Sequence, residues 1–236
     1  LKISQLQRLA VMQLQVRLAT VEDIPRIDQL VFSRYEPKVA AEISPFDTYR
    51  YIRFGQVLLV EDAANSLAAC AYEVGYDHPD RPSYLLRLVV RQDMEAKGLA
   101  TLLNRLASAM AYERGARSRH ALLDHSNSMS LYVHLNKVGS YFVDLIDVPC
   151  EGILNHFVSA RPLTAQTLAE NVIDDQVLMD LDSQQTLPLG CQWFEAQDLP
   201  SLKHLLRQDG LTVIAATCPP FQSDPANNQK LLLTRL

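Results

Sequence analysis

The sequence predicts an α+β protein in which helices flank a mixed central β-sheet. Two strand segments, 56–62 and 67–76, surround a short turn, as in an antiparallel β-hairpin. A further strand at 84–90 leads through a polar loop into an amphipathic helix at 98–114. Hairpin strands combined with strand–helix–strand units favour a mixed sheet over a doubly wound parallel one.

The remaining elements up to residue 162 follow from periodicity and capping signals. Thr20 and Asp23 form a T-x-x-D capping pattern ahead of an apolar helix face. The expected helices span 24–31, 46–54 and 127–138, and the expected strands span 14–19, 120–125, 141–148 and 153–160.

The character of the chain changes after Pro162. Residues 163–181 are acidic and weakly helical, and they precede a helix at 198–210 and strands at 211–217 and 231–236. We therefore expect one domain at 13–162 and a small C-terminal α/β extension at 163–236.

The extension carries a pattern seen earlier in the chain. Residues 191–206 align without gaps to residues 16–31 and share an Asp-apolar-Pro step and a helix face. One interpretation is a partial repeat of the N-terminal strand–helix unit. The alternative is convergence, because capped strand–helix entries tend towards similar patterns.

Composition favours a cytoplasmic enzyme. The chain has 236 residues, of which 48% are hydrophobic and 21% charged, and its net charge is −5. This charge gives no basic field for nucleic acid or an anionic membrane. No apolar run reaches the roughly 18 residues of a membrane span, and the N-terminal segment does not resemble a signal peptide. Four scattered cysteines fit a reducing compartment better than a disulfide framework.

The junction between the strand at 84–90 and the helix at 98–114 predicts an anion site. Gly98 and Ala100 keep side chains small at the helix start. First-turn N–H groups have no intrahelical partner, and the helix dipole adds partial positive charge there. A phosphate-bearing ligand is therefore expected.

The same junction resembles the signature motif of the GNAT acyltransferase superfamily, which is Leu-x-Val, a short loop, then Gln/Arg-x-x-Gly-x-Gly/Ala. Leu88-Val89-Val90 ends the strand and Glu95-Ala96-Lys97-Gly98-Leu99-Ala100 forms the loop. The resemblance covers residues 14–162 in element order. It implies that acetyl-CoA, or a related acyl-CoA, is the co-substrate and that the loop binds its pyrophosphate. The implied cofactor-binding residues are Val89 and Val90 (through sheet-like hydrogen bonds to pantetheine), Lys97, Gly98, Leu99, Ala100, Thr101 and Asn127.

This chain departs from the family pattern at two loop positions. Glu95 stands where the family has Gln or Arg, and Ala96 stands where Gly is common. A carboxylate beside a pyrophosphate repels it unless the side chain points away.

A second segment, 127–142, resembles the later Asn…Leu-Tyr…Leu-Gly-Phe part of the family. The resemblance places Asn127 near the pantetheine or pyrophosphate, and Gly139 at the helix end. It also implies that Tyr132 gives a proton to the departing CoA thiolate, a role that suits a phenol with a pKa of about 10. The alternative is that Tyr132 is an amphipathic residue at a helix–sheet seam.

The implied mechanism is direct attack of an amine on the thioester, so a base must remove the ammonium proton. Glu73, Asp124 and His125 are the candidates on the expected central strands, and Glu73 is the one that we predict. The alternative for each of the three is a polar residue without a catalytic role that ends a strand and faces water.

Other charged groups point to less specific roles. The spacings of His120, His125 and His134 do not fit a common metal site, so no metal is expected. Three arginines follow the long helix: Arg114, Arg117 and Arg119. We expect them to form a solvated C-terminal cap that complements the helix dipole, or to contact the CoA 3′-phosphate.

The function expected from the resemblance is acyl transfer from acyl-CoA to the amine of a small molecule or a protein. Two alternatives stay open: S-acyl transfer to a thiol or carrier protein, and a non-catalytic CoA-sensing or partner-binding module. The extension is a candidate for homodimerisation, because strands at 211–217 and 231–236 could extend a sheet across a partner.

Overall fold

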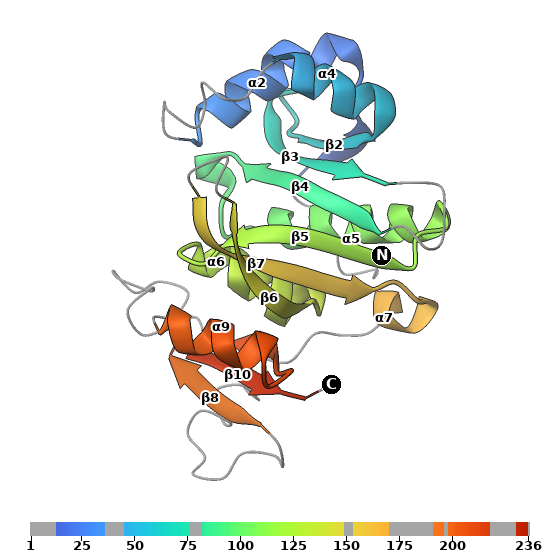
Figure 1. Ribbon diagram of the computed structural model, residues 1–236. Coiled ribbons are helices and arrows are strands. Elements are labelled where there is room, and N and C mark those ends of the chain that lie inside the picture. Colours follow the sequence, from blue (N-terminus) through green and yellow to red (C-terminus); the bar gives the residue numbers. More distant parts are fainter. Residues whose placement is uncertain are drawn as a thin grey trace. The chain divides into compact units, whose positions relative to one another are not determined.

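The computed structural model describes residues 13–35, 45–75, 82–148, 153–169, 191–195, 198–217 and 230–235 (Figure 1). The chain forms two compact units, which divide between Arg119 and His120. The predicted boundary at residue 162 concerns the extent of the family-like region, and it stays a prediction.

The described residues of the first unit form four strands that pair antiparallel with their neighbours in chain order. They are β1 (Gln15–Leu18), β2 (Gln56–Glu61), β3 (Leu67–Val74) and β4 (Ser83–Val90). The predicted strand at 14–19, the hairpin and the strand at 84–90 are therefore confirmed.

Helices cover both faces of this part of the sheet (Figure 1). The elements are η1 (Val21–Asp23), α2 (Ile24–Phe32), α4 (Pro45–Phe54), η2 (Gln92–Met94) and α5 (Leu99–Glu113). Side chains of α2 and α4 pack on the face of β3 that carries Cys70 and Tyr72. Because side chains alternate along a strand, Glu73 faces the opposite side, where α5 packs against β3 and β4.

The entry into α2 confirms the predicted capping pattern. The Asp23 carboxylate accepts a hydrogen bond from the Thr20 backbone N–H at 2.9 Å. Two nitrogens of the Arg17 guanidinium donate to the same carboxylate at 2.6 and 2.7 Å. This pairing lowers the pKa of Asp23, and Arg17 also lowers the pKa of Glu61 on β2.

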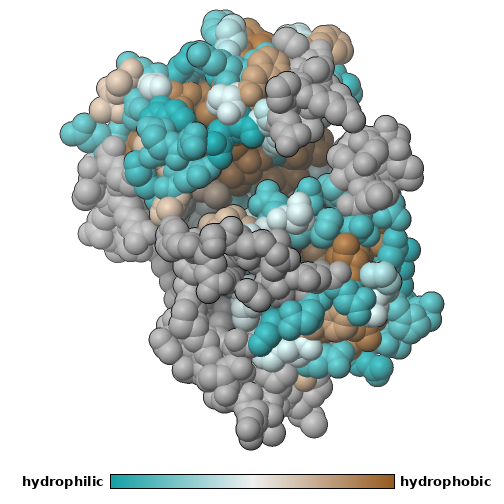
Figure 2. Space-filling view, turned by 90° about the vertical axis from the view of Figure 1, so that its left-hand side faces the viewer, coloured by the Kyte–Doolittle hydropathy of each residue, from teal (hydrophilic) through white to brown (hydrophobic). Residues whose placement is uncertain are grey.

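Large apolar side chains remain exposed on α2 and α4. Phe32, Phe46 and Phe54 are 40%, 65% and 74% exposed. Hydrophobic residues are visible between hydrophilic ones near the top of Figure 2, the end that carries these helices in Figure 1. These rings therefore lie outside the core of the unit.

In the part of the chain that the structure describes, the second unit contains six strands, which neighbour one another in the order β5-β7-β6-β9-β10-β8. β5 (Ser118–Asp124) crosses the division between the units. The other elements are α6 (Ser128–Tyr132), η3 (Val133–Val138), β6 (Tyr141–Val148), β7 (Ile153–Pro162), α7 (Ala165–Ala169), β8 (Gln192–Glu195), α9 (Leu199–Arg207), β9 (Thr212–Ala216) and β10 (Lys230–Thr234).

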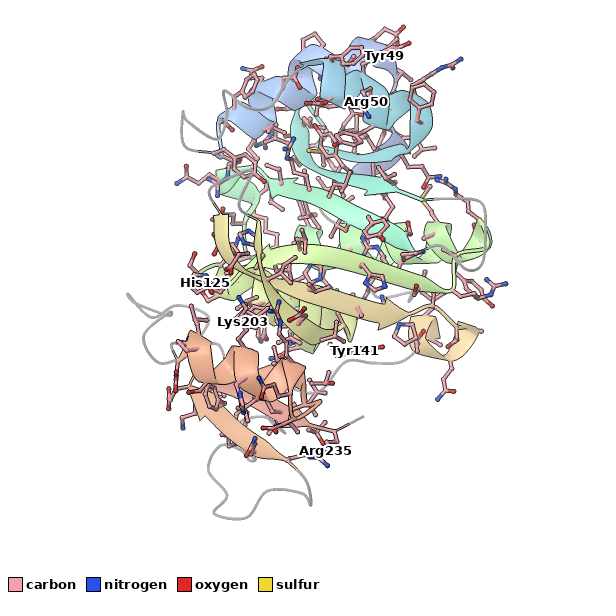
Figure 3. All side chains as sticks on the ribbon, in the orientation of Figure 1. Tyr49, Arg50, His125, Tyr141, Lys203 and Arg235 are labelled. Atoms are coloured by element: carbon pink, nitrogen blue, oxygen red, sulfur yellow. The ribbon has the colours of Figure 1, made fainter. Side chains whose placement is uncertain are left out.

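The described part of the C-terminal extension is packed into this unit. Lys203 and Arg207 of α9 pair with Asp147 and Asp144 of β6 at 2.9 and 2.6 Å, and Figure 3 labels Lys203. The buried Asn136 side chain donates to Ala216 O at 2.7 Å and accepts from Ala216 N–H at 3.1 Å. The predicted helix at 163–181 is described only as α7, and the rest of that segment lies outside the described residues.

The similarity between residues 16–31 and 191–206 extends to local structure but not to strand pairing. Asp23 and Asp198 are the N-caps of α2 and α9, and each helix has Pro in its first turn. However, β1 pairs with β2, the next strand along the chain, whereas β8 pairs with the last strand, β10. The partial repeat therefore stays a hypothesis.

The predicted free edges at 211–217 and 231–236 are wrong. β9 pairs with both β6 and β10, and β10 pairs with both β9 and β8. Apolar strands look alike in sequence whether they lie inside a sheet or at its edge, so the pattern could not separate the two cases. In the described part of this unit, β8 is the strand at that edge.

Candidate functional site

The loop between β4 and α5 is folded around a buried methionine. Met94 is buried, and its N–H donates to Arg91 O at 2.9 Å. Gly98 is the N-cap of α5 and has a left-handed φ of 82°. The helical hydrogen bonds begin with Leu102 N–H donating to Gly98 O at 3.0 Å. The N–H groups before Leu102 have no acceptor inside the helix, and N–H groups in this position can bind an anion.

Glu95 does not leave a bare negative charge beside this helix start. Its carboxylate forms an ion pair with the guanidinium of Arg34, just beyond the C-terminal end of α2. The pairing offsets the repulsion that Glu95 would exert on a phosphate. Arg34 could not be predicted as the partner of Glu95, because the two residues are 61 positions apart and no local pattern joins them.

Ala96 adopts a backbone conformation that favours glycine. Its φ is +57°, in the left-handed region, where a Cβ is disfavoured. The next residue, Lys97, is exposed, and its Nζ lies 3.3 Å from Met94 Sδ. The loop therefore contains two left-handed residues, Ala96 and Gly98, one on each side of Lys97.

The remaining predicted cofactor-binding residues lie on either side of this loop. On β4, Val89 is buried opposite Cys70 and Val90 is half-buried opposite Ala69. At the start of α5, Leu99 is buried while Ala100 and Thr101 are half-buried. The structure brings these residues together in the first unit with Lys97 and Gly98.

In the second unit, Asn127 and Tyr132 bracket the short helix α6. Asn127 is the N-cap, and its Oδ1 accepts from Ser130 N–H at 3.0 Å. Tyr132 is half-buried at the helix end, and Lys137 Nζ lies 5.0 Å from its ring centroid. This cation–π contact restricts the orientation of the phenol ring.

The predicted helix at 127–138 is confirmed, and its second half is a π-helix. The wider turns span Val133–Val138 directly after Tyr132, and Gly139 ends them with a φ of 75°. Single-turn π segments within helices occur frequently at functional sites, because they redirect the side chains around them.

Glu73, the predicted base, is buried in a hydrogen-bonded ion pair. The Ser83 hydroxyl donates to its Oε1 at 2.6 Å. Arg119 donates to both carboxylate oxygens, from Nε at 2.9 and 3.1 Å and from Nη2 at 2.8 Å. Glu73 is 1% exposed. With both oxygens occupied and no access to water, the carboxylate is better suited to a structural role than to accepting a proton.

Arg119 was expected to be a solvated helix cap, and this expectation is wrong. It lies on β5, is 3% exposed, and also donates to Asn104 Oδ1 and Ser108 Oγ of α5. The run of arginines resembled a helix C-terminus in sequence. The alternation of β5 instead turns Arg119 into the core, where Glu73 compensates its charge.

The other two base candidates lie at the end of β5. Asp124 is exposed, and its Oδ1 accepts from the N–H and the hydroxyl of Ser126, each at 2.8 Å. His125 follows it, and its Nδ1 lies 3.4 Å from Asp124 Oδ1 (Figure 3). Both side chains keep contact with solvent, as a proton acceptor needs.

Among the described residues, no group of His, Cys, Asp and Glu side chains is arranged to hold a metal ion. Within the same part of the chain, no helix is both long and apolar enough to cross a membrane.

Comparison with known proteins identifies the fold. Neither a protein-family model nor a curated protein matches the chain. Among solved structures, the NatC complex bound to Gag peptide and CoA matches with a TM-score of 0.56 and 15% identity, over 64% of this chain and 99% of that chain. A putative phosphinothricin N-acetyltransferase matches with a TM-score of 0.50 and 21% identity, over 64% of this chain and 99% of that chain.

A third structure, histone acetyltransferase HPA2 and related acetyltransferase from Corynebacterium glutamicum, matches with a TM-score of 0.50 and 15% identity, over 64% of this chain and 97% of that chain. These identities are low, so the likeness concerns the fold. The chain has the GNAT fold of these acetyltransferases, an α+β architecture with a central sheet flanked by helices, as the sequence predicts.

Proposed function

We propose that this protein is an N-acyltransferase that transfers an acetyl or another small acyl group from acyl-CoA to an amine. One observation carries the proposal: the first turn of α5 begins at a left-handed Gly98, and the nearby Glu95 is neutralised by Arg34. Together these features provide a set of backbone donors for a pyrophosphate without an opposing charge. The fold shared with acetyltransferases supports the same assignment.

Bound acyl-CoA supplies an acyl thioester, which an amine attacks directly. In this proposal Tyr132 donates its proton to the sulfur as the C–S bond breaks and the new C–N bond forms. A base takes the proton that the amine loses. Exposure favours Asp124 and His125 over Glu73 for that step, directly or through water. Asn127, in this scheme, holds α6 in place through its cap and so positions Tyr132.

The residue-level test is Tyr132→Phe, which keeps the ring and removes the proton. We expect kcat to fall by about 10²- to 10⁴-fold, the usual contribution of a general acid, with the Kd for CoA unchanged. Tyr49→Phe, on the surface of α4 in Figure 3, is the matched control and should retain full activity. Equal kcat in the Tyr132 variant and the wild type would remove Tyr132 from the mechanism.

A non-catalytic CoA-sensing protein is the second candidate, motivated by Glu95, which departs from the family's loop pattern, and by the C-terminal extension, which the proposed transfer does not use. Release of free CoA thiol, measured with amine, thiol and carrier-protein acceptors, separates the alternatives. Turnover with amines supports N-acyl transfer, and turnover only with thiols or carriers supports S-acyl transfer. Tight CoA binding without turnover in any assay supports a sensor.

A further inference from the structure

Arg87 of β4 is a half-buried cation that no carboxylate among the described residues balances directly. Its guanidinium carbon lies 5.4 Å from the centroid of the Tyr72 ring and 5.7 Å from that of Tyr35. Within the described part of the chain, Arg87 makes no ion pair within 4.0 Å. Cation–π contacts hold the charge in place and, apart from the hydrogen bond to the Tyr35 hydroxyl, leave N–H donors for a planar acceptor.

Asp28, whose charge interacts with that of Arg87, is a weak counter-ion. Asp28 of α2 is 6% exposed, and its Oδ1 accepts from Thr48 Oγ1 at 2.8 Å. Burial raises the pKa of Asp28, although the charge of Arg87 opposes that effect at longer range. Asp28 therefore neutralises Arg87 less completely than a direct carboxylate partner would.

A β-bulge fixes the face on which Arg87 lies. Arg87 is opposite Tyr72, but the next residue of β3, Glu73, is opposite Leu85, so Leu86 is the extra residue of β4. Paired residues share a face of the sheet. Arg87 is therefore on the α2 and α4 side with Tyr72, whereas the Glu73–Arg119 pair is on the α5 side, and the two arginines have separate roles.

The proposed position of acyl-CoA brings Arg87 near the reacting atoms. If the pyrophosphate lies at Gly98 and pantetheine runs along Val89 and Val90, the thioester end points back along β4 towards Arg87. Arg87 is two residues before Val89, or about 7 Å along a strand. A group attached close to the attacking nitrogen would then lie within reach of its long side chain.

We propose that Arg87 binds a carboxylate of the acceptor, and that the acceptor is an amino acid or a similar small amine carrying a carboxylate. This inference rests on the proposed acyl transfer and names its substrate class. A guanidinium fork matches a carboxylate through two parallel hydrogen bonds, which an uncharged carboxamide cannot reproduce. The two tyrosine rings fix the orientation of that fork before the acceptor arrives.

The test compares each amino acid with its own carboxamide as acceptor. The wild type should prefer the acid by about 10- to 100-fold in kcat/KM, the usual effect of hydrogen bonds to a charged group. Arg87→Met should abolish this preference by raising KM for the acid, with kcat, the carboxamide reaction and the Kd for CoA little changed. Arg87→Lys should restore only part of the preference, because a point charge replaces the fork.

Arg50→Met, a substitution on the exposed face of α4 labelled in Figure 3, should leave the preference intact. Thermal unfolding of each variant checks that it is folded. The inference is overturned if the wild type does not distinguish acid from carboxamide, or if Arg87→Met lowers both reactions equally, since a purely structural Arg87 would do so.

Failure of the proposed acyl transfer can be told apart from failure of this inference. If no amine supports turnover, binding of an N-acetyl amino acid is measured by ligand-observed NMR in the wild type and in Arg87→Met. Binding to the wild type alone supports a carboxylate site at Arg87. Equal binding to both proteins, or binding to neither, overturns it.

Discussion

At the residue scale, Ala96 shows a local cost in the loop that would hold the phosphate. A left-handed φ costs a non-glycine residue roughly 1–2 kcal/mol. Replacing that residue with glycine removes the cost, but part of the gain in stability is lost because glycine has more freedom in the unfolded chain. The φ of +57° at Ala96 therefore marks a position where this chain is less stable than a glycine-containing loop would be.

Ala96→Gly should raise the free energy of unfolding by about 0.5–1 kcal/mol, the difference between those two effects. Urea denaturation measures the change. Ala100→Gly, inside the first turn of α5, is the control and should lower stability by a similar amount, because glycine disfavours a helix. A destabilised Ala96→Gly variant would show that the left-handed conformation is not present in solution.

Glu73 and Arg119 provide a second test at this scale, because a structural ion pair and a catalytic base respond differently. Removing one partner of a buried pair leaves an uncompensated charge, so Glu73→Ala should lower the free energy of unfolding by about 3–5 kcal/mol. Replacing both residues with leucine should recover much of that loss. A Glu73→Ala variant with unchanged stability and abolished turnover would instead support the predicted role as base.

At the element scale, the junction of β1 and α2 depends on ionised carboxylates. Arg17 links Asp23 at the start of α2 to Glu61 on β2, and it lowers the pKa of both acids. A carboxylate whose pKa is lowered by folding stabilises the fold above its ordinary pKa. That contribution is lost as the pH falls and the folded carboxylate becomes protonated.

Asp23→Asn should therefore be less stable than the wild type at pH 7, and the difference should shrink as the pH falls below about 4. Urea midpoints measured between pH 7 and pH 2 test this. Asp93→Asn removes the exposed partner of Arg91 and is the control, since exposed ion pairs contribute little. Parallel pH profiles for wild type and Asp23→Asn would contradict the account.

The order and type of the elements could be predicted because their signals are local. Leu102, Leu103 and Ala107 share the apolar face of α5 and are buried, as the 3.6-residue period predicts. Long-range pairings have no such signal. The partners Arg34 and Glu95 are 61 positions apart and Glu73 and Arg119 are 46 apart, so the sequence revealed neither the neutralised loop nor the buried pair.

At the scale of the whole molecule, the described part of the extension pairs with strands that precede Pro162 in the second unit. β9 pairs with β6, and Asn136 hydrogen-bonds to Ala216, while the boundary at residue 162 stays a prediction. Strand pairing between distant segments depends on which apolar faces pack together during folding. A single sequence shows which faces are apolar but not which of them pair.

The proposed anion site at the start of α5 can be tested by native mass spectrometry with acetyl-CoA. The wild type should gain the mass of one acetyl-CoA, and Gly98→Ala should weaken that binding at least about tenfold by adding a side chain and strain beside the phosphate. Gly115→Ala is the matched control: Gly115 also has a left-handed φ, of +99°, lies beyond the other end of α5, and has open space around its Cβ position. This control should bind like the wild type. Absence of a bound species in the wild type, or equal binding by the Gly98 variant, would contradict the account.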